Sequence, residues 1–190
     1  MRTDGPGQSA LLLLDVIEIL NSFQVPYAVI GALAASFYGP VRASMDADAI
    51  VSLGPDKLQM EKLMSEFKKS GCSVSLRHGD TEDPVAGVIN VRDHFSNRVD
   101  LLTGIHGMGK DIFSRSVTAA FMGSKIQMIG VEDFIAMKIF AGSPLDLDDA
   151  WGVIKISRDK VNFILLRELV QRFGKNELAK LESLLKMNNF

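Results

Sequence analysis

The apolar periodicity of the chain changes at Gly130, and this change restricts the possible folds more than any other feature. Before it, short apolar runs typical of strands alternate with segments of helical periodicity. After it, helical periodicity covers residues 131–141, 144–156, 162–173 and 177–186. We therefore expect an α+β fold with a mixed sheet and flanking helices, followed by a helical segment. We place a core at residues 1–130 and a C-terminal helical segment, packed on that core, at residues 131–190.

The first part of the chain should hold three helices and seven strands. Helices are predicted over residues 11–23 and 31–38, and from Gly54-Pro55 to Ser70-Gly71. Strands are predicted over residues 27–30, 45–51, 72–77, 88–91, 97–102, 116–121 and 126–129.

Composition excludes several classes of protein. The chain has 190 residues, 47% of them hydrophobic, so it can bury a core without disulfides or a structural metal. Cys72 is the single cysteine, which rules out an intrachain disulfide and a cysteine-based zinc site. A net charge of -2 disfavours nonspecific binding to nucleic acid. No apolar run has the length of a membrane span or the form of a signal peptide, so we expect no membrane partner and a cytoplasmic location.

Two carboxylates lie inside one of the predicted strands. Asp46 and Asp48 are two residues apart, so alternation places both on one face and turns Met45, Ala47 and Ala49 toward the core. Asp100 is a third acid within an apolar strand. Solvent-facing acids at strand ends are the ordinary explanation of such a pattern, but two acid-bearing strands in one short chain favour a shared site. Carboxylates that converge repel one another unless a cation lies between them, and a hard divalent cation suits oxygen ligands.

A glycine precedes these acids. Gly31-Ala32 follows the predicted strand 27–30 and begins a helix, 15 residues before Asp46. Glycine permits a close approach of the backbone, and a helix N-terminus offers N–H groups to phosphate oxygens. A plain strand-to-helix turn is the alternative.

A set of residues along the first part of the chain carries a family resemblance: Ile30-Gly31-Ala32, Tyr38-Gly39, Arg42, Ser44, Asp46-Ala47-Asp48 and Asp100. This pattern resembles the nucleotidyltransferase superfamily (DNA polymerase β-like), above all its minimal bacterial members and the AbiEii-type toxin branch. Residues 130–138, with Asp146 and Asp149, are similar to the helix that follows the catalytic half in those branches. The resemblance spans roughly residues 27–151.

The resemblance implies an enzyme that moves a nucleoside monophosphate from a nucleoside triphosphate, such as ATP, to an acceptor hydroxyl. Asp46, Asp48 and Asp100 would bind two Mg²⁺ ions, with Asp100 nearest the acceptor as a ligand, a base or both. Gly31 and Ala32 would contact the phosphates.

Two basic residues are the best further candidates for phosphate contact: Arg42 and Lys138. Arg42 lies four residues before Asp46, and the alternative for it is a surface pair with a carboxylate. The alternative for Lys138 is a buried stem whose ammonium reaches water.

The resemblance leaves the acceptor open between a small molecule such as an antibiotic, a tRNA end and a protein side chain. A toxin of the AbiEii type would have an antitoxin partner. A second hypothesis is a catalytically weakened module that keeps the fold and binds a nucleotide or a partner. Two departures from the family pattern favour it: Ala32, where many members have serine, and Ser143-Pro144-Leu145, where toxin-like members usually have basic residues before the aspartate. A metal-dependent phosphohydrolase would usually need histidine ligands, and the three histidines here have no ligand spacing.

Two acidic or glycine-rich patterns are interpreted without catalysis. Asp146 is the acid of a helix cap that begins at Ser143-Pro144, and Asp149 lies on the following turn. Residues 104–110 have the glycine and lysine spacing of a phosphate-binding loop, but Asp111 stands where serine or threonine is needed, so we predict a glycine-rich turn.

Overall fold

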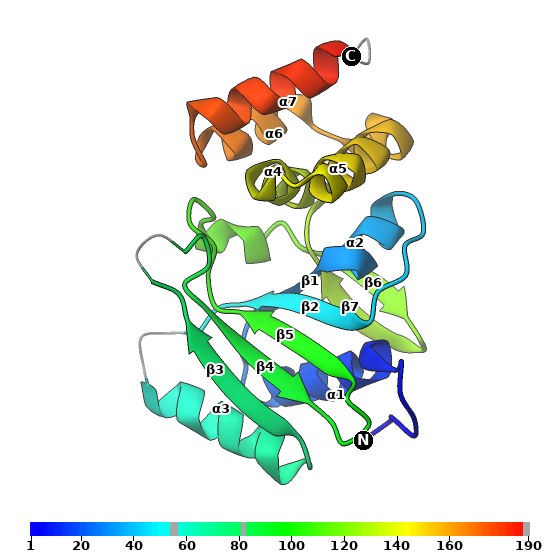
Figure 1. Ribbon diagram of the computed structural model, residues 1–190, viewed down its shortest axis with the longest axis vertical. Helices are drawn as coiled ribbons and strands as arrows, with labels where there is room; N and C mark the ends of the chain where they lie inside the picture. Colours follow the sequence, from blue (N-terminus) through cyan, green and yellow to red (C-terminus); the bar gives the residue numbers. More distant parts are fainter. Residues whose placement is uncertain (54–56, 81–82, 188–190) are drawn as a thin grey trace.

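The computed structural model describes residues 1–53, 57–80 and 83–187 (Figure 1). This part of the chain forms a seven-stranded mixed sheet and seven α-helices. The strands are β1 (Tyr27–Ile30), β2 (Asp46–Val51), β3 (Ser73–His78), β4 (Gly87–Arg92), β5 (Arg98–Leu102), β6 (Val117–Phe121) and β7 (Ser124–Met128). The helices are α1 (Ser9–Ser22), α2 (Gly31–Tyr38), α3 (Lys57–Lys69), α4 (Val131–Ala141), α5 (Pro144–Ile156), α6 (Phe163–Gln171) and α7 (Lys175–Met187). Two short 3₁₀ helices, η1 (Lys110–Phe113) and η2 (Arg158–Lys160), complete the described elements.

The strand order of the sheet is β3-β4-β5-β2-β1-β7-β6. β2 pairs parallel with β5 and antiparallel with β1, and β1 pairs parallel with β7. The remaining neighbours are antiparallel. β2 is thus the central strand, with β5 on one side and β1 on the other.

Helices cover both faces of the sheet. α1 packs on β2, β5 and α3, and in Figure 1 both α1 and α3 lie below the sheet. α2 and the four C-terminal helices lie above it, where α2 contacts α4 and α5. The alternation on β2 and β5 buries Ala47, Ala49, Val99 and Leu101, so the opposite side chains of these strands turn away from α1.

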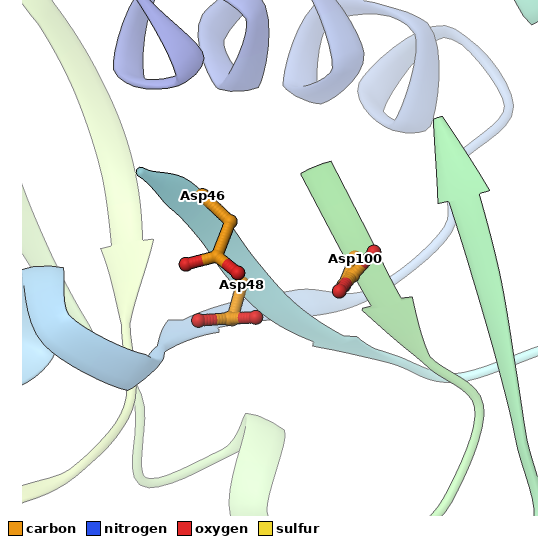
Figure 2. A group of neighbouring side chains, drawn as sticks. All are labelled: Asp46, Asp48 and Asp100. Atoms are coloured by element: carbon orange, nitrogen blue, oxygen red, sulfur yellow. The ribbon is translucent and has the colours of Figure 1, made fainter. Parts of the chain in front are cut away.

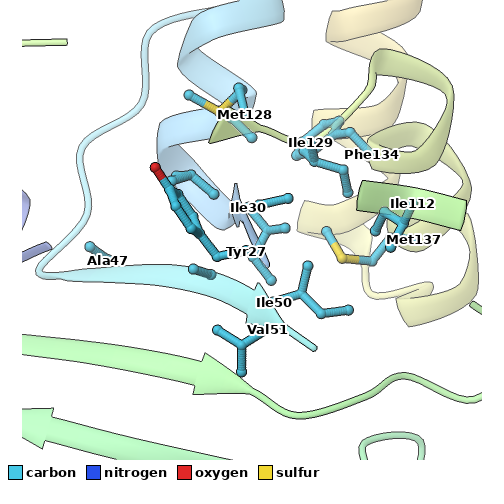
Figure 3. Close-up of a cluster of buried hydrophobic side chains, with 14 of the residues drawn as sticks. Tyr27, Ile30, Ala47, Ile50, Val51, Ile112, Met128, Ile129, Phe134 and Met137 are labelled. Carbon is cyan, nitrogen blue, oxygen red and sulfur yellow. The ribbon is translucent and has the colours of Figure 1, made fainter. Parts of the chain in front are cut away.

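A continuous apolar core joins the sheet to α4. Figure 3 shows Ile30 and Ile50 from β1 and β2 in one buried cluster with Phe134 and Met137 of α4. Phe134 has no exposed surface, and full burial of such a side chain contributes about 1.5–3 kcal/mol. This packing fixes α4, and with it Lys138, above the centre of the sheet.

The predicted fold class is confirmed, and so is each predicted helix and strand. Most of their described ends agree with the prediction to within two residues. The predicted start of the third helix at Gly54-Pro55 lies outside the described residues. Residues 104–109 lie outside the named helices and strands, as the predicted turn requires, while Lys110 begins η1, the short 3₁₀ helix that precedes β6. The division into a core, residues 1–130, and a helical segment, residues 131–190, stays a prediction.

The predicted orientation of Met45 was wrong. Met45 was expected to face the core, but it is 81% exposed. β2 begins only at Asp46, and Met45 belongs to the irregular segment before it, where its carbonyl accepts a hydrogen bond from Ser9 Oγ. Strand alternation therefore does not extend to Met45.

Candidate functional site

Parallel pairing of β2 and β5 brings three acids together. Asp48 lies beside Asp100 in the register, and Asp46 lies beside Arg98. One carboxylate oxygen from each of Asp46, Asp48 and Asp100 lies within 4.8 Å of the other two. Figure 2 shows the three side chains gathered on one face of the two strands. The sequence pattern placed these residues on strands, and the register between the strands makes them one cluster.

Gly31 closes one side of this cluster. It begins α2 directly after β1 and has φ +65°, a conformation that favours glycine. A Cβ atom at this position would lie 2.2 Å from Asp48 Oδ2. A side chain at this position would therefore collide with the Asp48 carboxylate, and contact of Gly31 with a phosphate stays a prediction.

Neutral donors hold the two outer acids. Ser44 Oγ donates to Asp46 Oδ1 at 2.6 Å, and Asn90 Nδ2 donates to Asp100 Oδ1 at 2.5 Å. The hydrogen bond from Ser44 is the main reason that the pKa of Asp46 is lowered. Both hydrogen bonds thus fix the orientation of these carboxylates, and the one from Ser44 also favours the ionised form of Asp46.

Asp48 is the acid of the cluster whose ionised form is disfavoured by its surroundings. Within the described part of the chain, its carboxylate has no hydrogen bond or ion pair. Burial, and then repulsion from Asp46 and Asp100, raise its pKa to about 6. A divalent cation would relieve this repulsion, and the all-carboxylate donor set fits a hard ion such as Mg²⁺.

Arg98 is a member of the cluster that the sequence interpretation missed. Its Nη2 donates to Asp46 Oδ2 and lies 3.2 Å from Asp100 Oδ2. The signal was available, because Arg98-Val99-Asp100 has the same two-residue alternation that was applied to Asp46 and Asp48. Asn90 was missed as well, and its place beside Asp100 follows only from the pairing of β4 with β5.

The two basic candidates, Arg42 and Lys138, converge on one acid. Arg42 Nη1 lies 2.6 Å from Asp149 Oδ2, and Lys138 Nζ lies 2.8 Å from the same oxygen. The Lys138 charge opposes the rise in the Asp48 pKa that burial causes, so Lys138 is within electrostatic range of the cluster. Ala32, the second residue of α2, is buried beside Gly31.

The two downstream acids have different roles. Asp146 fits the predicted cap, because its N–H donates to Ser143 Oγ at 3.2 Å, and its carboxylate also binds Lys138 at 2.8 Å. Asp149 lies on the helical turn that follows Asp146, as predicted. It is only 6% exposed, however, and it bridges Arg42 and Lys138. No local pattern indicates that bridge, because its partners come from distant segments.

An apolar groove begins at the end of β5. Leu102, two residues after Asp100, lines it together with Lys138 of α4. Its volume is about 480 Å³, within the range of small-molecule sites. The other lining residues are Pro84, Val85, Ile105, Met137, Phe140, Ala141 and Asp146.

Comparison with solved structures defines the class of fold. No protein-family model matches the sequence, and no curated protein matches it. Solved structures of nucleotidyltransferases nevertheless share its architecture at 11–15% identity. At these identities the likeness establishes the fold, and the chain therefore has the nucleotidyltransferase fold.

Three of these solved structures are as follows. An antigenic nucleotidyltransferase-like protein from Paracoccidioides brasiliensis is 15% identical, with a TM-score of 0.59 over 98% of this chain and 92% of its own. ANT(2'')-Ia in complex with adenylyl-2''-tobramycin is 12% identical, with a TM-score of 0.56 over 86% of this chain and 95% of its own. The lincomycin-bound lincosamide antibiotic adenylyltransferase LnuA is 11% identical, with a TM-score of 0.50 over 81% of this chain and 99% of its own.

None of the helices in the described ranges combines the length and apolar character needed to cross a bilayer.

Proposed function

We propose that the chain is a Mg²⁺-dependent nucleotidyltransferase that moves a nucleoside monophosphate from a nucleoside triphosphate to an acceptor hydroxyl. The acceptor oxygen would bond to the α-phosphorus, and the bond from that phosphorus to pyrophosphate, the leaving group, would break. The observation that carries this proposal is the convergence of Asp46, Asp48 and Asp100 next to a helix that begins at Gly31. The nucleotidyltransferase fold supports the same reaction class.

Asp46, Asp48 and Asp100 would hold the metal. When bound there, divalent cations neutralise phosphate charge and lower the pKa of an acceptor hydroxyl. Asp48 has the strongest need of a cation, since no donor of the described chain balances its charge and its pKa is raised to about 6. Ser44 and Asn90 fix the orientation of Asp46 and Asp100 toward Asp48.

The triphosphate would lie on the β1 side of β2. The first N–H groups of α2, at Gly31 and Ala32, have no acceptor within the helix and suit phosphate oxygens. Arg42 and Lys138 would supply positive charge from the adjoining segments. Asp149 holds both of these cations, so the triphosphate would share them with that carboxylate.

The acceptor would lie on the β5 side, because the strand order places Asp100 on the opposite side of β2 from Gly31. There Asp100 would orient the acceptor hydroxyl and, in the role of base, take its proton. The groove beyond Leu102 is mainly apolar, and Lys138, the one cation among its described lining residues, is paired with two aspartates. This chemistry favours a small acceptor with an apolar body over a tRNA end, which needs neutralised phosphates.

The antibiotic complexes of ANT(2'')-Ia and LnuA agree with a small acceptor. The antitoxin partner stays a prediction that rests on the family resemblance alone.

The test is transfer of label from α-labelled nucleoside triphosphates, with Mg²⁺, to three separate pools: small hydroxylated compounds, total tRNA and protein. We expect labelling of the small-molecule pool, and a loss of about a hundredfold or more for Asp100→Asn. Asp148→Asn, a change at an exposed acid of α5, is the matched control and should keep full activity. Nucleotide binding without transfer to any pool would contradict the proposal and favour the binding module.

A further inference from the structure

Arg98 places a positive charge inside the acidic cluster. The parallel register sets it beside Asp46, and alternation sets it on the same face as Asp100. Asp46 and Asp48 of β2 and Arg98 and Asp100 of β5 thus form a four-residue square across two strands. Three negative charges and one positive charge leave a surplus that one divalent cation would neutralise.

The guanidinium group of Arg98 is held through a single nitrogen. Nη2 makes both contacts, the hydrogen bond to Asp46 and the 3.2 Å contact with Asp100. Nε is buried, and it has no hydrogen-bond partner in the described part of the chain. The side chain is 37% exposed, and it does not form the two parallel hydrogen bonds of the strongest arginine–carboxylate pairs. Arg98 can therefore leave the carboxylates at a lower cost than a bidentate, buried arginine.

Arg98 contacts the carboxylate oxygens that do not accept hydrogen bonds from Ser44 and Asn90. Ser44 occupies Oδ1 of Asp46 and Asn90 occupies Oδ1 of Asp100. Arg98 contacts Oδ2 of both. A cation bound by these acids would compete with Arg98 for the same oxygens.

We propose that Arg98 is a resident counter-ion of the acidic cluster. It holds Asp46 and Asp100 in place while no divalent cation is bound, and it lowers the affinity of the cluster for that cation. The inference rests on the proposed function, because it takes the three carboxylates as the metal site. Arg98 is then a positioning residue that sets the metal concentration at which the site fills.

The test is Mn²⁺ binding to the metal-free full-length protein, followed through the electron paramagnetic resonance signal of free Mn²⁺. We expect Arg98→Gln to lower the Kd for Mn²⁺ by about tenfold or more, the scale of one unit charge removed from a partly exposed site. Arg98→Lys keeps the charge and should stay near the wild-type Kd. Arg92→Gln is the matched control: Arg92 is exposed on β4, lies beside Arg98 in the register, and makes no ion pair in the described ranges.

A second measurement covers the case in which Arg98→Gln folds poorly without metal. The Mn²⁺-induced rise in melting temperature should be larger for Arg98→Gln than for the wild type, because the metal then replaces the missing counter-ion. An unchanged or higher Kd, or a smaller rise in melting temperature, would overturn the role of Arg98 and leave the proposed function intact. Absence of Mn²⁺ binding in both the wild type and Arg98→Gln would instead overturn the metal site itself.

Discussion

Replacing Asp48 with asparagine should stabilise the metal-free protein while it removes the proposed activity. The pKa of Asp48 is about 6 in the folded protein, against an ordinary value of 3.8. Between these values the folded chain binds more protons than the unfolded chain, so the contribution of Asp48 to stability falls as the pH rises through this window. At pH 8 the ionised carboxylate lowers the free energy of unfolding by about 3 kcal/mol, and at pH 5 by about half as much.

Urea titrations in EDTA measure this effect directly. Asp48→Asn should be more stable than the wild type by about 3 kcal/mol at pH 8 and by about 1.5 kcal/mol at pH 5. Added Mg²⁺ should raise the stability of the wild type and leave Asp48→Asn nearly unchanged. Asp46→Asn is a control of opposite sign, because the pKa of Asp46 is lowered and its ionised form stabilises the fold. A variant Asp48→Asn no more stable than the wild type at pH 8 would refute the electrostatic argument.

Two further substitutions test the close contact at Gly31 and a buried ion pair at the start of α4. Gly31→Ala places a methyl group 2.2 Å from a carboxylate oxygen of Asp48, and we expect this variant to have a lower melting temperature and no metal binding. Gly71→Ala is the control, because Gly71 has φ +90° but no neighbouring atom within 4 Å of the added methyl group. It should lower the free energy of unfolding only by the backbone strain of about 1–2 kcal/mol. Arg115→Ala leaves the buried carboxylate of Asp133, on α4, without its cation, and it should lower the free energy of unfolding by about 3 kcal/mol in urea titrations. Arg167→Ala, which removes an exposed ion pair, should lower it by less than about 1 kcal/mol. Equal losses would contradict this difference.

Local patterns in the sequence were sufficient to predict the helices, the strands and the three acids that the structure brings together. Alternation in Asp46-Ala47-Asp48 fixed a shared face, and the buried runs around Asp100 fixed a second acid-bearing strand. Gly31 was predicted from its place between a strand and a helix. Each of these inferences depends on residues within a few positions of one another, where backbone geometry alone sets the direction of a side chain.

The strand order and the contacts across it could not be predicted in this way. Arg98 meets Asp46 only because β2 and β5 pair in parallel, and Asn90 meets Asp100 only because β4 follows in the sheet. Asp149 is separated from Arg42 by 107 positions, so no periodicity relates them. Met45 shows a different error, since alternation was extended one residue before the start of β2.

The shared oxygen of Asp149 has a consequence for chimeric proteins. This one atom on α5 ties the segment that leads into β2, through Arg42, to α4, through Lys138. A graft that kept α4 but exchanged α5, α6 and α7 for those of a relative would leave Arg42 and Lys138 facing each other unless it also supplied an acid at the position of Asp149. Design of such hybrids should therefore treat Arg42, Lys138 and Asp149 as a single transferable unit.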